Sequence, residues 1–454
     1  MAAATALALG AAGVGQTIEA SNTGADYTPG EKFEPLAASS ACVGALEKPF
    51  VLPSGYDQQV VAQEPDGGTA DLWDMNTQNE SGKDAGRYVY RTHEVAPGSQ
   101  VSVTDLKTGE TEVLAQRLDW ERFDGIVWSP QGTILAGEET TSATVRDPQV
   151  PEAEAGLVYE IFVDPNDPSE LDTDNPRDNV APFDDGIAVR PALGSKSHEG
   201  MRFDQRGYYY GISESSPGSI FRFIPDREGD LSEGKLQALR TRNGRTGGGM
   251  WVNITDQEAR VNAQTAATSR GANGYNRPED VETGESTGVD VNNGGNTLYV
   301  AMTGTDEVIA VDLSNRNRTF AYQYVGATEA GNAVAGEFDS PDNLALDRKG
   351  NLAITEDPGG TPPTKTMGDD IFIAEPRGGT RRPAGEVARF ASIKDCIAEP
   401  TGVYFALEGT EEFTEGTPRE ALVNDESLFV NRQHAGQGTV FDQFVSIAPT
   451  EDDE

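Results

Sequence analysis

Several common signatures are missing from this sequence of 454 residues. It has no GxSxG elbow, no Walker loop and no Rossmann fingerprint, so nucleophilic serine catalysis has no support. No segment beyond the N-terminus is apolar enough for a membrane helix, so we expect no membrane span. Cysteine occurs twice, as Cys42 and Cys396. These two residues could form one disulfide between the N-terminal segment and the last part of the fold, or remain unpaired and buried.

Basic residues, and lysine in particular, are also scarce. The chain carries 75 aspartates and glutamates against 35 lysines and arginines, nine of them lysines, and its formal net charge is −40. Such a charge repels nucleic acid and anionic membranes, so we expect neither as a partner. Molar salt shortens the Debye length to about 3 Å and would relieve the self-repulsion. The composition therefore favours a halophilic protein, with an acidic secreted protein from a GC-rich organism as the alternative.

What the sequence does contain is a recurring layout: an acidic residue, a short apolar strand, a turn with Asp, Ser or Gly, and a second apolar strand. Strands of period two that recur at intervals of tens of residues are typical of β-propeller blades, which surround a shared axis. We therefore predict an all-β protein with a β-propeller fold. The layout occurs at residues 123–139, 198–215 and 341–357, and more loosely at 277–304 and 399–409.

The expected domain organisation is simple. We predict a single propeller domain over residues 87–450, preceded by an N-terminal arm over residues 21–86. Residues 1–20 are rich in Ala, Gly and Leu and uncharged before Glu19, which is typical of an export signal that lacks its basic front. An Ala-rich terminus of a cytoplasmic protein is the alternative for this segment.

One segment departs from the strand pattern. Residues 226–276 include TDQEARVNAQTAATSRGANG, whose Ala-rich, Asp-capped character predicts a helix that ends at Gly271. The segment leads directly to Arg277. We therefore expect a lid-like helical insertion that carries site residues over the central channel.

The acidic residues of the repeats point to a metal site. Each lies where an innermost strand is expected to begin, so residues far apart in the sequence would meet at one mouth of the channel. Carboxylates held so close repel one another unless cations lie between them, and hard oxygen ligands favour calcium, magnesium, manganese or ferric iron. The candidate metal ligands are Asp124, Glu138, Glu139, Glu199, Glu279, Asp280, Asp342 and Glu399.

The tetrapeptide at residues 277–280 is more specific. A turn stiffened by Pro278 would present the guanidinium of Arg277 beside two carboxylates, the combination that holds a phosphate or a carboxylate next to a cation. A surface turn in which Arg277 pairs with its neighbours is the alternative. Lys196 could add a second positive charge near the leaving group of a substrate.

Read in order, the motifs PxGTxLxxEE, HEG, RPED, SPDNLALDxxGNL, EPTG and LFVNRQH resemble those of the PhoX-type alkaline phosphatases. The resemblance runs from about residue 87 to residue 436. It implies a six-bladed propeller, a calcium- and iron-dependent enzyme, a small-molecule phosphate ester as substrate, and secretion by the twin-arginine route. It also implies that Arg277 contacts the phosphate and that the metal ligands include Glu139, Glu199, Glu279 and Glu399.

The chain departs from the family pattern at three places. Asp124 stands where the family has a cysteine that ligates iron, Gln131 stands where it has a tryptophan, and Ala435 interrupts the usual His-Pro-Gly. A thiolate is a soft ligand, whereas Asp124 offers hard oxygen. We therefore expect several calcium ions, with Fe³⁺ or Mn²⁺ as further candidates.

Taken together, the sequence predicts a secreted metal-dependent phosphatase with Arg277 and Glu279 in catalytic roles. A metal-bound oxo or hydroxide would attack the phosphorus of a phosphate monoester in line. One alternative is a non-catalytic propeller in which calcium joins the blades and the surface binds a partner. A calcium-dependent, lactonase-like hydrolase is another, although one calcium ion would not require so many acids. No motif encodes the oligomeric state, for which a monomer is the expectation.

Overall fold

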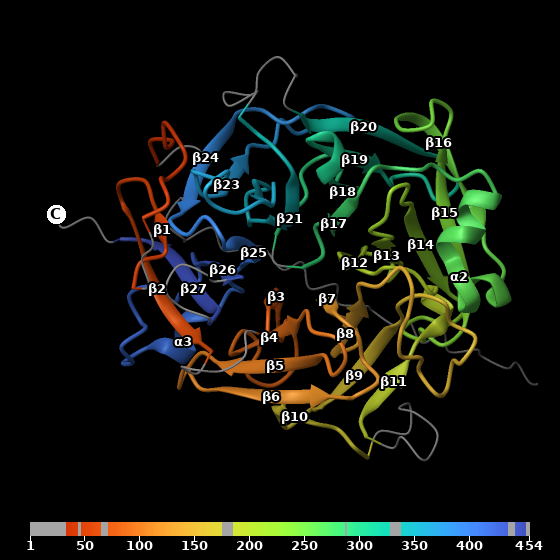
Figure 1. Ribbon diagram of the computed structural model, residues 1–454, viewed down its shortest axis with the longest axis horizontal. Helices are drawn as coiled ribbons and strands as arrows, with labels where there is room; N and C mark the ends of the chain where they lie inside the picture. Colours follow the sequence, from red (N-terminus) through yellow and green to blue (C-terminus); the bar gives the residue numbers. More distant parts are fainter. Residues whose placement is uncertain are drawn as a thin grey trace, which may run out of the picture.

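In the computed structural model the chain forms a ring of β-sheets around a central channel (Figure 1). The structure describes residues 33–43, 47–64, 71–174, 185–286, 288–326, 337–434 and 441–450, so the expected export signal lies outside the described residues. None of the described helices has the length and hydropathy needed to cross a membrane. The predicted β-propeller is confirmed.

The sheets correspond to six blades, each beginning with the strand nearest the channel. Blade 1 contains β3 (Trp73–Gln78), β4 (Tyr88–His93), β5 (Gln100–Asp105) and β6 (Thr111–Gln116). Blade 2 contains β7 (Phe123–Trp128), β8 (Thr133–Glu138) and β9 (Val158–Asp164), with β10 (Asp167–Leu171) and β11 (Ile187–Val189) both paired to β9. Blade 3 contains β12 (Met201–Phe203), β13 (Tyr209–Ile212), β14 (Ile220–Pro225), β15 (Gly234–Thr241) and β16 (Gly247–Asn253).

The second half of the ring repeats this plan. Blade 4 contains β17 (Pro278–Glu282), β18 (Thr297–Met302), β19 (Glu307–Asp312) and β20 (Thr319–Gly326). Because β16 pairs with β20, blades 3 and 4 form one nine-stranded sheet. Blade 5 contains β21 (Pro341–Leu346), β22 (Leu352–Glu356), β23 (Asp370–Ala374) and β24 (Val387–Ile393), with β1 (Phe50–Val51) at its outer edge. Blade 6 contains β25 (Glu399–Phe405), β26 (Leu428–Gln433), β27 (Gln443–Pro449) and β2 (Tyr56–Gln63).

The two ends of the chain close the ring in blade 6. Strand β2 pairs with β27 along its whole length, from Tyr56 opposite Pro449 to Gln63 opposite Gln443. Both β2 and the innermost strand β3 lie within residues 21–86, which we expected to form an arm outside the propeller. The propeller therefore begins before residue 87. We placed the start of the domain too late because the prediction depended on the first long alternating run. Strand β2 was overlooked since it pairs with a strand almost 400 residues away.

The question left open for the two cysteines is also answered. Cys42 and Cys396 form a disulfide whose Cα atoms lie 5.3 Å apart. It links the segment before β1 to the connection between β24 and β25, three residues before β25 begins. Both cysteines of the chain are consumed in this bond, so neither offers a thiolate to a metal.

The hydrophobic core lies between the blades. Six clusters of buried residues each combine side chains from two adjacent blades. At the seam of blades 1 and 2, for example, the ring of Trp120 lies 4.6 Å from that of Phe123 and 5.3 Å from that of Tyr159, measured between centroids. Each sheet thus buries both faces against its neighbours, which fixes the tilt of the blades around the channel.

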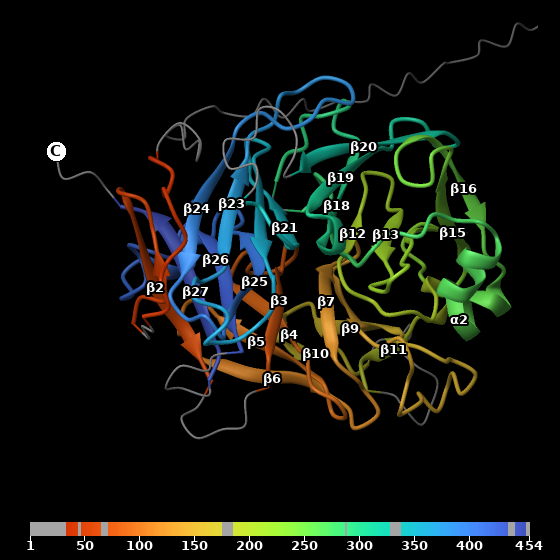
Figure 2. The same cartoon turned by 45° about the horizontal axis from the view of Figure 1, so that its top comes forward.

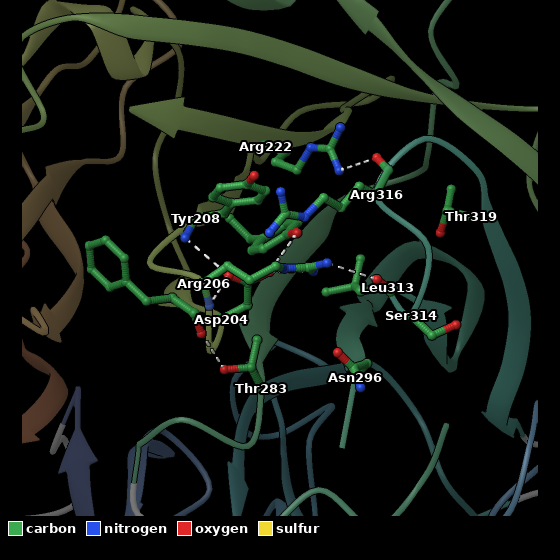
Figure 3. Close-up of polar contacts among 12 residues, drawn as sticks. Asp204, Arg206, Tyr208, Arg222, Thr283, Asn296, Leu313, Ser314, Arg316 and Thr319 are labelled. Atoms are coloured by element: carbon green, nitrogen blue, oxygen red, sulfur yellow. Dashed lines mark hydrogen bonds and ion pairs between the residues drawn. The ribbon is translucent and has the colours of Figure 1, made fainter. Parts of the chain in front are cut away.

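Polar side chains join blades as well. Between blades 3 and 4, the Arg206 Nη1 donates to the carbonyl of Leu313 at 3.3 Å, and the Arg222 Nη1 donates to the carbonyl of Arg316 at 3.1 Å (Figure 3). The Tyr208 ring lies among the guanidinium groups of Arg206, Arg222 and Arg316, with carbon–centroid distances of 5.2 to 6.0 Å. The seam that also carries the β16–β20 pairing is therefore held by both backbone and side-chain contacts.

The predicted helix is present as α2 (Asp256–Ser269), but it does not cover the channel. Thr255 caps its first turn in a capping box with Glu258, and Gly271 with φ of +72° follows its end. The helix lies at the outer edge of blade 3, beside β15 (Figures 1 and 2). The expected insertion over residues 226–276 also contains β15 and β16, which belong to blade 3. The lid-like placement is therefore corrected: buried alanines dock α2 on the outside of the ring.

From that position α2 is hydrogen-bonded to the segment that precedes Glu199. The N–H of Ser195 donates to the carbonyl of Ala259 at 2.7 Å, and the N–H of Ala263 donates to the carbonyl of Ser195 at 2.8 Å. Ala263 is also completely buried. Ser195 lies four residues before Glu199, so these hydrogen bonds to the helix help to position the segment that carries Glu199 to the channel. The remaining short helical turns are η1 (Pro191–Leu193), η2 (Thr303–Thr305) and α3 (Glu411–Thr414).

Candidate metal centre

Acidic residues stand at the same position in most innermost strands. The second residue of β3, β7, β17 and β21 is acidic, and so is the first residue of β25. These acidic residues line one cavity, so the innermost strands present them at the same mouth of the channel. These residues are Asp74, Asp124, Glu279, Asp342 and Glu399.

A local irregularity aims these side chains. In β7 the pairing with β8 passes from Phe123 directly to Ile126, and in β21 the pairing with β22 passes from Pro341 to Leu344. The same register shift occurs at the start of β3 and of β17. A bulge of this kind releases residues from the regular ladder and turns a side chain toward a site. The acidic residues of these four strands lie within the unpaired steps, whereas Glu399 of β25 is paired with Gln433.

The acids surround one cavity of about 410 Å³, which we call the channel-mouth cavity. Ten carboxylates of described residues line it, against four basic side chains: Arg122, Arg277, Lys365 and His434. Glu199, Glu279 and Asp342 each place a carboxylate oxygen within 4.8 Å of the other two. The other lining carboxylates are Asp74, Glu94, Asp124, Glu139, Glu214, Asp357 and Glu399.

The three grouped carboxyl groups of this cavity are hard to ionise without a cation. Burial, and then the charge of Glu279, raises the pKa of Glu199 well above its usual range. Burial and Glu279 act in the same way on the pKa of Asp342. The pKa of Glu279 itself rises to about 7, mainly through burial. Each group thus carries a proton or needs a positive partner in place of one.

Buried oxygen atoms without partners indicate what that partner could be. Asp124 Oδ1 is buried and has no hydrogen-bond partner, and within the described chain no backbone N–H donates to Glu199, Glu279 or Asp342. Burying an ionised carboxylate without a hydrogen-bond donor costs free energy of folding unless a cation lies beside it. The donor set of hard oxygens, close enough to share an ion, therefore fits a cation such as calcium or manganese.

Arg277 stands at the rim of the same cavity. Its Nε donates to Glu214 Oε1 at 3.0 Å, and its Nη2 lies 2.9 Å from Glu279 Oε1 as an ion pair without a directed hydrogen bond. The φ of Arg277 is +46°, in the left-handed region, which turns the chain sharply into β17. The side chain is about half exposed, so its guanidinium faces both the acids and a ligand entering the cavity.

Six of the predicted metal ligands line the cavity, and two do not. Glu138 is buried on the other side of its strand, where its carboxylate accepts from the N–H groups of Glu121 and Leu157, both at 2.9 Å. Asp280 accepts from the N–H of Val281 at 2.7 Å and of Leu344 at 2.9 Å. Both carboxylates hold backbone in place. The residues that do line the cavity are Asp124, Glu139, Glu199, Glu279, Asp342 and Glu399.

Lys196 is also absent from the cavity wall. Its Nζ is fully buried, 2.8 Å from His198 Nδ1, and lies over the ring of Phe221 at 5.3 Å. Burial holds the pKa of this lysine well below its usual range. The expected second positive charge near the substrate therefore does not come from Lys196.

Sequence reasoning missed several cavity residues. Asp74 lies in a segment that we placed in the arm, although it occupies the same strand position as Asp124, so an earlier start of the repeats would have found it. Glu214 and Asp357 each follow the second strand of a blade, a position for which we used no signal. Arg122 directly precedes an innermost strand, as Arg277 does.

Comparisons with known proteins agree with this architecture. The family model described as alkaline phosphatase PhoX matches residues 128–436. A search of curated proteins found no match. Among solved structures, the chain is similar to Pseudomonas fluorescens PhoX in complex with vanadate, a transition state analogue, with a TM-score of 0.58 and 16% identity over 92% of this chain and 98% of that one.

Other solved structures match with lower TM-scores. A putative gluconolactonase matches with a TM-score of 0.45 and 12% identity over 88% of this chain and 94% of that one. Regucalcin, a calcium-binding protein from Agrobacterium tumefaciens, matches with a TM-score of 0.43 and 10% identity over 87% and 95%. The family model spans more than half of the sequence. This chain therefore belongs to the PhoX alkaline phosphatase family.

Proposed function

We propose that this protein is a metal-dependent phosphatase that hydrolyses phosphate monoesters in the channel-mouth cavity. Membership of the family supports the reaction class. The observation that carries the proposal is Arg277, whose guanidinium lies 2.9 Å from Glu279, one of three carboxylates grouped within 4.8 Å. An arginine next to a carboxylate cluster combines a phosphate-binding group with ligands for cations.

Glu199, Glu279 and Asp342 would hold a cation, and the neighbouring Asp124, Glu139 and Glu399 could hold further ones. Bound cations would supply Lewis acidity to the phosphoryl group and to the attacking water. The ligand set favours calcium or manganese over softer metals, because the oxygen of Asp124 replaces a thiolate and both cysteines are paired. Fe³⁺ is a further candidate.

The chain's own residues orient the substrate. Arg277 would bind a non-bridging oxygen of the phosphate and offset the charge that develops there in the transition state. Glu214 fixes the orientation of the guanidinium, because it accepts a hydrogen bond from Arg277 Nε at 3.0 Å. The guanidinium therefore need not reorganise when the substrate enters. Glu279 contacts both the arginine and the carboxylate cluster and would set the distance between phosphate and cation.

We also propose that the protein works outside the cytoplasm at high salt. A disulfide persists in oxidising compartments, which supports an extracytoplasmic location. The net charge of −40 supports a halophilic environment, because concentrated salt screens the repulsion between surface carboxylates.

The test is hydrolysis of p-nitrophenyl phosphate by the purified full-length chain in molar salt. We expect activity after supplementation with calcium, alone or with Mn²⁺ or Fe³⁺, and loss of activity after chelation. Arg277→Gln should lower kcat/KM by about 100-fold, the loss typical of one transition-state hydrogen-bond donor.

Glu412→Gln, an exposed change in α3, serves as the matched control and should leave activity unchanged. Tightly bound calcium without turnover under any metal supplement would refute the phosphatase and favour a calcium-stabilised binding protein instead.

A further inference from the structure

Arg122 occupies the same structural position in blade 2 that Arg277 occupies in blade 4. Each directly precedes the innermost strand of its blade, β7 or β17, and each has a left-handed φ, +50° for Arg122 and +46° for Arg277. The corresponding residues are Leu72 before β3 and Ser340 before β21, with φ of +52° and +44°. The position is thus a repeated feature of the fold, and in two blades it carries an arginine.

The backbone contacts of the two arginines match in detail. The N–H of Arg122 donates to the carbonyl of Val95 at 2.8 Å, and that of Arg277 donates to the carbonyl of Ser215 at 3.2 Å. Val95 follows Glu94, and Ser215 follows Glu214. Each arginine is therefore tied to the residue after a cavity glutamate of the preceding blade.

The side-chain contacts repeat the same arrangement. Arg122 pairs with Glu94 of the preceding blade and lies 2.8 Å from Glu139 of its own blade. Arg277 pairs with Glu214 of the preceding blade and with Glu279 of its own. In both cases one glutamate comes from each of two adjacent blades. Both arginine side chains are 46% exposed at the cavity rim.

The two arginines line the same cavity. The carboxyl groups of Glu139 and Glu214 lie close enough to interact, so one continuous series of side chains runs from Arg122 through these two acids to Arg277. Within the described residues, no hydrogen bond is found for Nη1 of Arg122 or of Arg277. Each guanidinium therefore keeps N–H donors for a ligand in the cavity.

We propose that Arg122 is a second substrate-contacting residue, and that Arg122 and Arg277 together clamp a doubly charged terminal phosphate. This inference rests on the proposed phosphatase function. Two guanidinium groups at the rim favour a dianion over a monoanion, because each contributes a charge-assisted contact to a separate oxygen. The pair therefore selects phosphate monoesters, whose terminal group is dianionic, over diesters.

The test compares Arg122→Gln, Arg122→Lys and Arg277→Gln with the wild-type holoprotein. Binding of inorganic phosphate is measured by calorimetry, and KM is measured for p-nitrophenyl phosphate and for bis-p-nitrophenyl phosphate. We expect Arg122→Gln to weaken phosphate binding and raise the monoester KM by about tenfold or more, with a smaller effect on the diester. Arg122→Lys should recover part of the affinity, since it keeps the charge but loses the planar fork.

Metal content and melting temperature of each variant separate the clamp from a structural ion pair. Arg227→Gln, which removes a 74% exposed arginine of a surface ion pair with Asp230, is the matched control and should change nothing. Unchanged phosphate affinity in Arg122→Gln would overturn the proposal. Loss of bound metal in that variant would also overturn it, since Arg122 would then only hold the carboxylates Glu94 and Glu139.

Failure of the clamp and failure of the proposed function give different results. If Arg277→Gln loses activity and Arg122→Gln does not, the phosphatase stands and the clamp is refuted. If the wild type binds phosphate through both arginines without hydrolysing esters, the clamp is supported and the phosphatase is refuted. A wild type that does not bind phosphate at all contradicts both.

Discussion

Two groups of three carboxylates in this molecule look alike in composition and are built in opposite ways. In each, the carboxylate oxygens lie within 4.8 Å of one another. In the group of Glu64, Asp71 and Asp442, backbone N–H groups serve two of the three acids: those of Asp71 and Asp442 donate to Glu64 at 2.8 and 2.7 Å, and that of Trp73 donates to Asp442 at 2.8 Å. These carboxylates tie β2, β3 and β27 together where the ring closes.

The group of Glu199, Glu279 and Asp342 receives no backbone N–H in the described chain. Two of its members lie in bulges at the start of innermost strands, which aim them at the channel axis instead of at the backbone. The comparison teaches that closeness of acids does not by itself make a ligand site. The supply of backbone donors decides whether a carboxylate cluster joins chain segments or remains available for a cation.

Substitutions in the cavity group provide the most direct test of the difference between the two groups. Glu199→Gln and Glu279→Gln should each lower metal occupancy, melting temperature and phosphatase activity together, with kcat/KM falling about 100-fold or more because charge stabilisation by the cations is lost. Elemental analysis of the purified variants, calorimetry and a steady-state assay measure the three quantities. Unchanged occupancy would mean that these residues are not ligands.

The Glu64 group should respond in the opposite way. Glu64→Ala leaves the N–H groups of Asp71 and Asp442 without their acceptor, which should reduce the free energy of unfolding by about 1–3 kcal/mol. Metal content and kcat/KM should stay at the wild-type level. Denaturant titration with a parallel assay provides the measurement, and a loss of bound metal in this variant would erase the distinction between the two groups.

The smallest expected effect is a difference in pH dependence. Burial, followed by the hydrogen bond and charge of Asp71, raises the pKa of Glu64 from 4.5 to about 8. A carboxyl group with a raised pKa binds more protons in the folded state, so its contribution to stability is complete below pH 4.5 and is lost as the pH rises through about 8. The wild type should therefore lose stability between these values relative to Glu64→Gln.

Unfolding free energies across this pH range measure the difference, with Glu412→Gln as the exposed control. Parallel pH profiles of the wild type and Glu64→Gln would show that Glu64 titrates normally in the folded protein.

Much of the fold could be read from the sequence, because strand alternation and Asp/Gly turns are local signals. The turn at residues 347–350 is an example: the Asp347 carboxylate accepts from the N–H groups of Lys349 and Asn351, both at 2.8 Å, and Gly350 supplies a φ of +87°. The closing strand β2 gave no such signal. Its pairing with β27 joins opposite ends of the chain, which no local pattern encodes.

The candidate site was predicted in outline and corrected in its members. Adjacent residues of a strand point to opposite faces, so the pair Glu138 and Glu139 could not both face the channel. The sequence does not state which of the two does, and the structure places Glu139 at the cavity and Glu138 against backbone N–H groups. The same applies to Glu279 and Asp280.

By itself, the sequence determined the repeating strands, the acid at the head of most innermost strands and the helix after Thr255, since each of these depends on residues close together in the chain. The tertiary structure alone decided how the ring closes, which acids face the channel, and that Arg122 lines the same cavity as Arg277. These depend on the order of blades around the axis and on bulges that turn single side chains, and both are set by contacts between segments far apart in the sequence.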